Sequence, residues 1–165
     1  MKKLSFFVLL LPFLAFAFVA SPHQPPAKKI HWYTWDEMVL ANAKNPKPIF
    51  VDVYTDWCGW CKKMDRSTFR DAKVVKILTD DFYAVKLDAE QRESILFQGT
   101  EFKYVGTNRQ GHHELAAALL DGQMSFPTTV MLTPQYERIA ISPGYKDAQT
   151  ILKELEYVTS RAYEK

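Results

Sequence analysis

The chain has 165 residues, with 21 basic and 19 acidic side chains, and 47% of its residues are hydrophobic. This size and balance are typical of one ordinary globular domain. Because the charges nearly cancel and no basic cluster stands out, we expect no nucleic-acid partner, whose phosphates a binding protein must neutralise.

The N-terminus has the pattern of a secretory signal peptide. Lys2 and Lys3 precede an uncharged run from Leu4 to Ala20. A charged start, a short apolar core and a small-residue end are typical of a secretory leader. Ala15-Phe16-Ala17 is the best cleavage site, so we expect a signal peptide over residues 1–17, with residue 20 as the alternative end.

The location that this signal implies is export, to a periplasm if the source is bacterial. The alternative is a membrane-anchored protein whose N-terminal segment stays uncleaved. We disfavour the anchor because Pro12 interrupts the run, and a run of 17 residues is short for a span that needs about 20.

The segment after the leader, residues 18–31, is rich in proline and indicates an extended tether, so we expect the folded domain over residues 32–165. Its first helix is predicted to begin at Thr34, because Thr34 and Glu37 have the spacing of a capping box. The aromatic residues around this start, Trp32, Tyr33 and Trp35, are interpreted as core and edge packing.

Four runs rich in β-branched and aromatic residues predict strands over residues 49–54, 82–87, 128–132 and 138–142. The first two are separated by helical sequence and should be parallel, whereas a short turn joins the last two as an antiparallel hairpin. The predicted fold class is α/β, with a central mixed β-sheet flanked by helices.

Helices are predicted over residues 62–66, from a cap at Asp71 to Leu78, over 112–120, and after a cap at Asp147. Residues 88–111 contain three glycines and no clear periodicity. We predict a long loop there, with short elements at most.

The chain contains two cysteines, Cys58 and Cys61, in one C-x-x-C motif between a predicted strand and a predicted helix. A bridge that closes so small a loop constrains little of the unfolded chain. The pair is therefore interpreted as chemical rather than structural, with an inert local disulfide as the alternative.

The segment VDVYTDWCGWCKKM around this motif resembles the active-site segment of the thioredoxin superfamily, and the resemblance extends from about residue 32 to the C-terminus. It implies a thioredoxin fold with a helical and loop insertion before the cis-proline strand. It also implies thiol–disulfide exchange without a bound cofactor.

Cys58 is the predicted nucleophile, because a helix N-terminus lowers the pKa of a thiol placed there. Cys61, about one turn further on and less exposed, is predicted to resolve the mixed disulfide. The resemblance further implies a cis peptide bond between Phe126 and Pro127. It implies a buried acid at Asp52, which would accept the proton of Cys61.

Lys86 matches the lysine that neighbours this acid in the family, with an outward-facing charged pair as the alternative for both residues. The resemblance also assigns substrate contacts to the residues around the motif and the cis-proline, namely Trp57, Gly59, Trp60, Phe126 and Pro127. The Gly-Trp dipeptide between the cysteines supplies no cation, which disfavours a very strong oxidant.

Asp88 and Pro127 are separated by 38 residues, more than a minimal thioredoxin needs. This insertion carries Tyr104, Arg109 and the pair His112–His113, and it is either a substrate-facing lid or padding for one edge. A zinc site built from the cysteines and the two histidines is disfavoured, because adjacent histidines point in different directions.

The sequence thus predicts an exported thiol–disulfide oxidoreductase that reduces disulfides of proteins or peptides, with no metal. A membrane protein would be the electron donor in an oxidising periplasm. The alternatives are a disulfide oxidase or isomerase, and a non-catalytic module that presents a peptide groove beside Pro127.

Overall fold

The computed structural model describes residues 28–107 and 111–165. The predicted signal peptide and most of the predicted tether lie outside the described residues. Within the described part of the chain, no helix is both long and apolar enough to cross a membrane.

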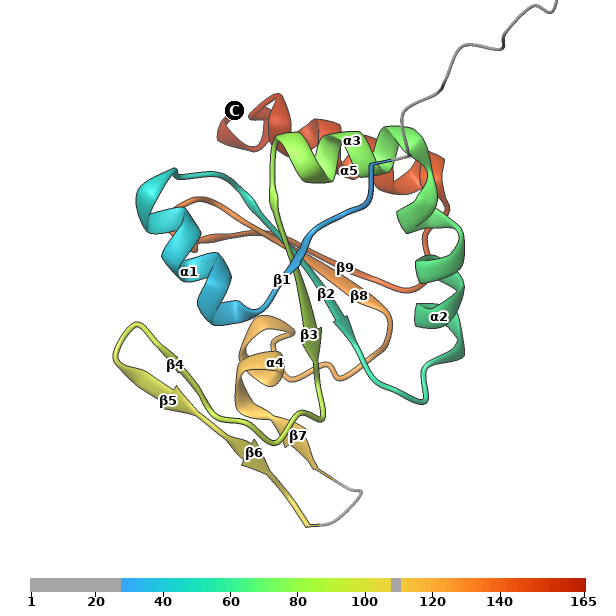
Figure 1. The fold of residues 1–165 in the computed structure, drawn as a ribbon. Helices are drawn as coiled ribbons and strands as arrows, with labels where there is room; N and C mark the ends of the chain where they lie inside the picture. The colour runs from blue at the N-terminus through green and yellow to red at the C-terminus, as the bar shows by residue number, and fades with distance from the viewer. Residues whose placement is uncertain (1–27, 108–110) are drawn as a thin grey trace, which may run out of the picture.

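A five-stranded sheet forms the centre of the domain, in the order β1-β3-β2-β8-β9. Strands β1, β3 and β2 are mutually parallel, whereas β8 and β9 run antiparallel to their neighbours. The predicted mixed sheet is confirmed (Figure 1). The strands are β1 (Trp32–Tyr33), β2 (Ile49–Tyr54), β3 (Tyr83–Asp88), β8 (Thr128–Leu132) and β9 (Arg138–Pro143).

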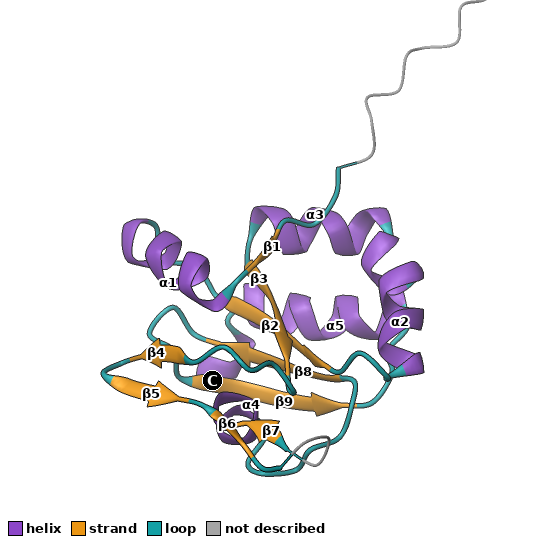
Figure 2. Ribbon diagram, turned by 60° about the horizontal axis from the view of Figure 1, so that its bottom comes forward, coloured by secondary structure: helices purple, strands orange, loops and turns teal. Residues whose placement is uncertain are grey.

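Helices cover both faces of this sheet, as Figure 2 shows. Buried side chains of α2, α3 and α5 pack on one face, and those of α1 and α4 pack on the other. The helices are α1 (Trp35–Lys44), α2 (Gly59–Arg66), α3 (Ala72–Asp80), α4 (Glu114–Leu119) and α5 (Ala148–Thr159), with 3-10 turns η1 (Thr68–Arg70) and η2 (Ala162–Glu164).

Strand β2 lies at the middle of the sheet, and alternation divides its side chains between the two cores. Phe50 packs with the α2, α3 and α5 side, whereas Val51 and Val53 pack with the α1 and α4 side. Asp52 lies on the same face of the sheet as Phe50, so its carboxylate points toward the layer formed by α2, α3 and α5.

The predicted helix caps are confirmed. Thr34 accepts from the N–H of Glu37, whose carboxylate accepts from the N–H of Thr34 in return. Asp71 caps α3, and Asp147 caps α5. Each cap satisfies backbone N–H groups that a helix start leaves unpaired.

The segment predicted as a long loop with short elements at most, residues 88–111, contains strands of two or three residues. Two short hairpins occupy the insertion, one of β4 (Ile95–Phe97) with β5 (Thr100–Phe102) and one of β6 (Tyr104–Val105) with β7 (His112–His113). Gln98 and Gly99 join β4 to β5 with φ values of 50° and 78°, the left-handed conformation that a two-residue hairpin turn needs.

Several boundaries also differ from the predictions, and three of these differences result from strand pairing. Residues 112–113 form β7, so α4 begins at Glu114 instead of at residue 112. Trp32 and Tyr33, expected to serve only in packing, also form the edge strand β1 by pairing with β3. Strand β3 begins at Tyr83 rather than at residue 82. Pairing between distant segments decides each of these boundaries, and local patterns do not contain it.

Candidate active site

The two cysteines form a disulfide at the first turn of α2. Their Cα atoms are 5.3 Å apart. Cys58 is the N-cap residue, and its Sγ accepts a hydrogen bond from the Cys61 N–H at 3.1 Å. The predicted helix start is confirmed, and a backbone N–H points at the Cys58 sulfur. After reduction, the same N–H and the positive end of the helix dipole would stabilise a Cys58 thiolate.

Both cysteines are buried in this oxidised form, with relative exposures of 4% for Cys58 and 2% for Cys61. The expected difference in exposure is therefore small. Position on the helix distinguishes the two sulfurs, because only Cys58 occupies the cap.

Trp57 and Trp60 flank the disulfide and are 66% and 56% exposed. Trp57 meets the Phe126 ring edge-on at 5.9 Å between centroids, and Trp60 lies 5.2 Å from the Tyr145 ring. We call these four side chains the aromatic rim. Gly59 lies between them with open space where a side chain would project.

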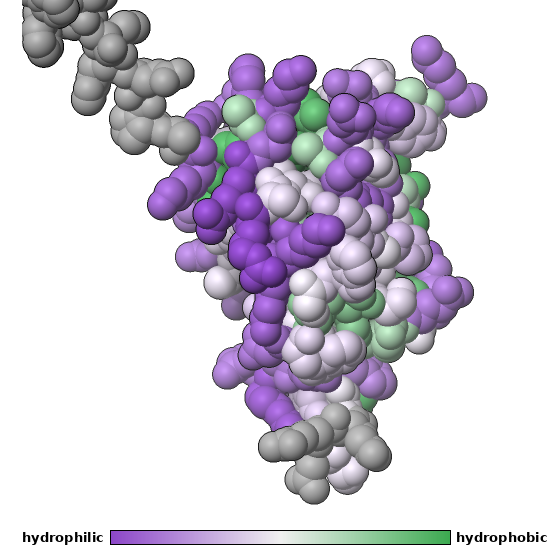
Figure 3. Space-filling model, turned by 90° about the vertical axis from the view of Figure 1, so that its right-hand side faces the viewer, coloured by the Kyte–Doolittle hydropathy of each residue, from purple (hydrophilic) through white to green (hydrophobic). Residues whose placement is uncertain are grey.

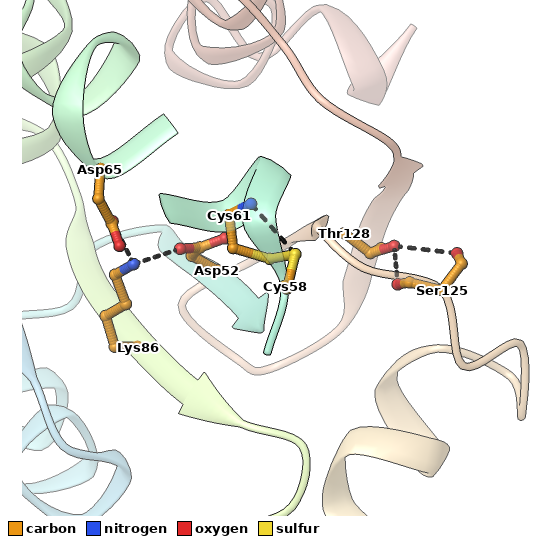
Figure 4. Close-up of a disulfide and its surroundings, with 7 residues drawn as sticks. All are labelled: Asp52, Cys58, Cys61, Asp65, Lys86, Ser125 and Thr128. Carbon is orange, nitrogen blue, oxygen red and sulfur yellow. Dashed lines mark hydrogen bonds and ion pairs between the residues drawn. A yellow bond between two sulfur atoms is a disulfide. The ribbon is translucent and has the colours of Figure 1, made fainter. Parts of the chain in front are cut away.

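The peptide bond between Phe126 and Pro127 is cis, as predicted. The Pro127 carbonyl accepts from the Gly144 N–H at 2.8 Å, which ties this loop to the residue before Tyr145. The Thr128 hydroxyl donates to the Ser125 carbonyl at 2.7 Å. These bonds fix the backbone on both sides of the proline, next to the first turn of α2 (Figure 4).

Asp52 is 1% exposed, so the predicted buried acid is confirmed. Figure 4 shows its carboxylate projecting from β2 toward the first turn of α2, where Cys61 lies. Lys86 Nζ forms an ion pair with Oδ2 at 2.7 Å, and neither carboxylate oxygen has a hydrogen-bond partner among the described residues. Burial raises the pKa of Asp52, and Lys86 offsets only part of that effect.

Lys86 stands opposite Asp52 in the register of β3 with β2. Its amino group also lies 2.5 Å from Asp65 Oδ1, so one ammonium bridges two carboxylates (Figure 4). Burial lowers the pKa of Lys86, but the two carboxylates outweigh it and raise the pKa overall. An outward-facing pair is thereby excluded, although one side of Lys86 borders a cavity of about 580 Å³.

Sequence reasoning missed several residues at this site. Asp65 follows Cys61 by four positions, and this helical spacing was the available signal. Lys63 Nζ lies 4.8 Å from the ring centroids of both Trp60 and Tyr145. Trp60 itself is uncharged, but its ring binds the Lys63 ammonium through a cation–π contact.

Lys146, also missed, is 5% exposed and donates to the carbonyls of Ser142, Pro143 and Gly144. Burial lowers its pKa. The Lys146 side chain stabilises the turn that carries Tyr145. No sequence pattern predicted this role for Lys146.

The histidine pair of the insertion lies apart from the cysteines. His113 is fully buried, where its Nε2 faces the Glu93 carbonyl at 3.1 Å and its Nδ1 accepts from the Leu115 N–H. Both ring nitrogens are thus engaged by backbone, and burial lowers the pKa of His113. Within the described ranges, no group of three or more metal-binding side chains comes together.

The family model Thioredox_DsbH, described as "Protein of unknown function, DUF255", matches residues 19–159. The chain belongs to this family. The match covers the cysteine pair, Asp52, Lys86 and the cis-proline together. The resemblance to the thioredoxin superfamily stated above is confirmed.

Among solved structures, a "DsbH Oxidoreductase" is similar with a TM-score of 0.56 and 17% identity, over 82% of this chain and 89% of that one. A thioredoxin from Thermus thermophilus has a TM-score of 0.59 and 18% identity, over 79% of this chain and 88% of that one. At these identities the similarity establishes the thioredoxin fold alone.

Among curated proteins, an uncharacterised protein of Caenorhabditis elegans is 40% identical over 67 residues, or 40% of this chain and 9% of that protein. The thiol:disulfide interchange protein DsbD of Ralstonia nicotianae is 47% identical over 45 residues, or 27% of this chain and 7% of DsbD. This chain therefore spans less than a tenth of either relative. This chain combines a thioredoxin fold of the oxidoreductase type with one C-x-x-C motif, whose two cysteines form a disulfide.

Proposed function

We propose that this protein is an exported thiol–disulfide oxidoreductase that reduces disulfides of protein or peptide clients at Cys58 and Cys61. The observation that carries the proposal is the cysteine pair at the start of α2, with the Cys61 N–H on the Cys58 sulfur. A helix terminus of this kind stabilises a thiolate, which is the form that attacks disulfides.

The reaction begins with both cysteines reduced. The Cys58 thiolate attacks a client disulfide, forms a mixed disulfide with one client sulfur and releases the other as a thiolate. Cys61 then loses its proton to Asp52, attacks the Cys58 sulfur and releases the second client thiol. The client gains two electrons, and the protein is left with the Cys58–Cys61 disulfide.

Each turnover consumes the dithiol, so an electron donor must restore it. The predicted signal peptide supports export, and the similarity to DsbD, a named thiol:disulfide interchange protein, supports disulfide exchange as the reaction. In an oxidising periplasm, the donor would be a membrane protein. No bound cofactor takes part in these steps, because both electrons move between sulfur atoms.

Trapping of clients tests the assignment of the two cysteines. Cys61→Ala removes the resolving thiol, so mixed disulfides at Cys58 should accumulate and appear as adducts on non-reducing gels. Cys58→Ala should give none. Adducts from Cys58→Ala alone would mean that Cys61 is the nucleophile. Equal adducts from both variants would mean that the two cysteines do not have separate roles.

Turnover separates the proposal from a non-catalytic module. The reduced protein should accelerate insulin reduction by dithiothreitol, and the Cys58→Ser/Cys61→Ser variant should not. A module that only presents a peptide groove would still bind its clients after both substitutions and would show no turnover before them. An oxidase or isomerase would instead form or reshuffle disulfides in a reduced or scrambled client.

A further inference from the structure

A closed ring of contacts surrounds the disulfide. Trp57 touches Phe126, which precedes Pro127, and the Pro127 carbonyl is bonded to Gly144. Tyr145 follows and touches Trp60, which returns to the cysteines through Gly59. A client segment that reaches the Cys58 sulfur would therefore lie beside the aromatic rim.

The two tryptophans of the rim are exposed, against the usual burial of aromatic residues, whereas Phe126 and Tyr145 are half-buried. Of the four tryptophans, Trp35 is 3% exposed and Trp32 is half-buried, whereas the two that flank the cysteines are more than half exposed. Seen from the side of α2, the surface is strongly hydrophilic along one edge, and pale and hydrophobic atoms gather across its lower middle (Figure 3). Exposed apolar surface concentrated at one place marks a binding site.

The two sides of the rim carry opposite charges. On the Trp57 side, the indole N–H donates to Glu90 Oε1 at 2.9 Å, and the Glu90 N–H is bonded to Asp88, which fixes that segment. On the Trp60 side, Lys63 lies over the Trp60 and Tyr145 rings. Each charge is held by an aromatic residue of the rim, so each would stand beside a docked client.

We propose that the rim selects clients whose cysteine is flanked by apolar residues, with a cationic side chain on the Trp57 side and a carboxylate on the Trp60 side. This inference rests on the proposed function, since the client is the disulfide that Cys58 attacks. Apolar flanks would cover the exposed rings, and the client charges would complement Glu90 and Lys63. Complementary charges at a rim act mainly on the rate of encounter.

The test uses peptides whose single cysteine carries thionitrobenzoate through a disulfide. Attack by Cys58 releases the thionitrobenzoate chromophore, so absorbance follows the first step alone. One peptide has lysine beyond the flanking leucines (Lys-Leu-Cys-Leu-Lys), and the other has glutamate (Glu-Leu-Cys-Leu-Glu). A second pair, with serine in place of leucine in each peptide, measures the contribution of the apolar flanks.

Glu90→Gln should slow the lysine peptide about threefold at low ionic strength and leave the glutamate peptide unchanged or faster. Lys63→Gln should do the reverse. The serine peptides should react more slowly than their leucine counterparts with every variant. Glu101→Gln and Lys103→Gln are matched controls, because this exposed ion pair lies on the insertion away from the rim.

Equal effects of Glu90→Gln and Lys63→Gln on both peptides, or no effect on either, would overturn the inference. Equal rates for the leucine and serine peptides would overturn its apolar part. In all these outcomes the wild-type protein still releases thionitrobenzoate, so the proposed function stands. Absence of release from every peptide would instead count against the proposed function.

Discussion

Asp52 has a buried carboxylate and lies beneath the cysteine pair. Burial of the carboxylate lowers the stability of the fold, whereas its position beneath the cysteines favours thiol exchange. Its pKa in the folded protein lies above its value in the unfolded chain. Ionisation therefore costs stability as the pH rises from the unfolded pKa through the folded pKa, and the cost is absent below both.

Asp52→Asn should accordingly stabilise the protein by on the order of 1 kcal/mol near pH 8, because a neutral amide is cheaper to bury than a carboxylate. The gain should fade as the pH approaches the unfolded pKa, as urea unfolding at several pH values would measure. The same variant should slow resolution of the mixed disulfide by about tenfold or more between pH 6 and 8. An unchanged exchange rate would leave Asp52 with a structural role only.

Asp65 competes with Asp52 for the ammonium of Lys86, and its negative charge raises the pKa of Asp52. Asp65→Asn should leave Lys86 paired with Asp52 alone. The pKa of Asp52 should then fall, and the rising limb of the pH–rate profile for resolution should move to lower pH.

Carbon-13 NMR titration of the Asp52 carboxyl would measure the effect of Asp65→Asn directly. The groups that face Asp52 are Lys86 from β3, Asp65 and Cys61 from α2, and Lys146 from the β9–α5 turn. Asp80→Asn, which removes a surface carboxylate paired with Lys28 and Lys76, is the matched control. A rise in the Asp52 pKa would mean that Lys86 leaves Asp52 when Asp65 is neutral.

At the scale of elements, the β4–β5 hairpin packs on the core rather than on the cysteines. Phe97 lies between the rings of Trp35 and Tyr136, at 5.1 and 5.0 Å between centroids. This part of the insertion thus serves as padding over α1 and the β8–β9 turn. Among the described residues of the insertion, Glu90 and Phe126, near its two ends, contact Trp57.

Phe97→Ala should therefore lower the free energy of unfolding without changing thiol exchange. The loss should be about 2 kcal/mol, less than the roughly 3–5 kcal/mol of a fully buried phenylalanine, because Phe97 is only half-buried. Exchange with the thionitrobenzoate peptides should stay within about twofold of wild type. A larger change in exchange at unaltered stability would point to a lid.

Local signals were enough for most elements of the central domain. The capping residues Thr34, Asp71 and Asp147 announced three helices, because a cap acts on N–H groups within three residues of itself. The strands of the insertion were not predicted from such local signals. Its strands are two or three residues long, too short to show an alternating pattern.

At the scale of the whole molecule, the charges around the cysteines predict the direction of electron flow. The Gly59-Trp60 dipeptide contributes no cation, Lys63 is solvent-exposed, and Asp52 disfavours a nearby thiolate when it is ionised. The helix terminus is thus the main group that stabilises the dithiol form. This stabilisation is modest compared with the stabilisation that a strong oxidant gives its own dithiol form.

We expect a reduction potential near that of thioredoxin, about −270 mV, rather than near the roughly −120 mV of a strong periplasmic oxidase. Equilibration with glutathione, followed by alkylation of free thiols, measures this potential. A protein that remains largely dithiol in a buffer where thioredoxin is already a disulfide would be an oxidant. That result would reverse the proposed direction.

The sequence by itself determined the mixed sheet, the helix caps, the C-x-x-C motif at a strand–helix junction and the positions of Asp52, Lys86 and Pro127. The caps and the motif depend on neighbours a few residues apart, and the strand directions follow from the connections between the strands, whereas Asp52, Lys86 and Pro127 were implied by the resemblance to the thioredoxin superfamily. Only the tertiary structure decided that Asp52 and Asp65 share Lys86, that Tyr145 completes the aromatic rim with Lys63 over its ring, and that Glu90 accepts a hydrogen bond from Trp57. The physical reason is that these contacts join surfaces of different elements, whose relative placement depends on the packing of the whole core.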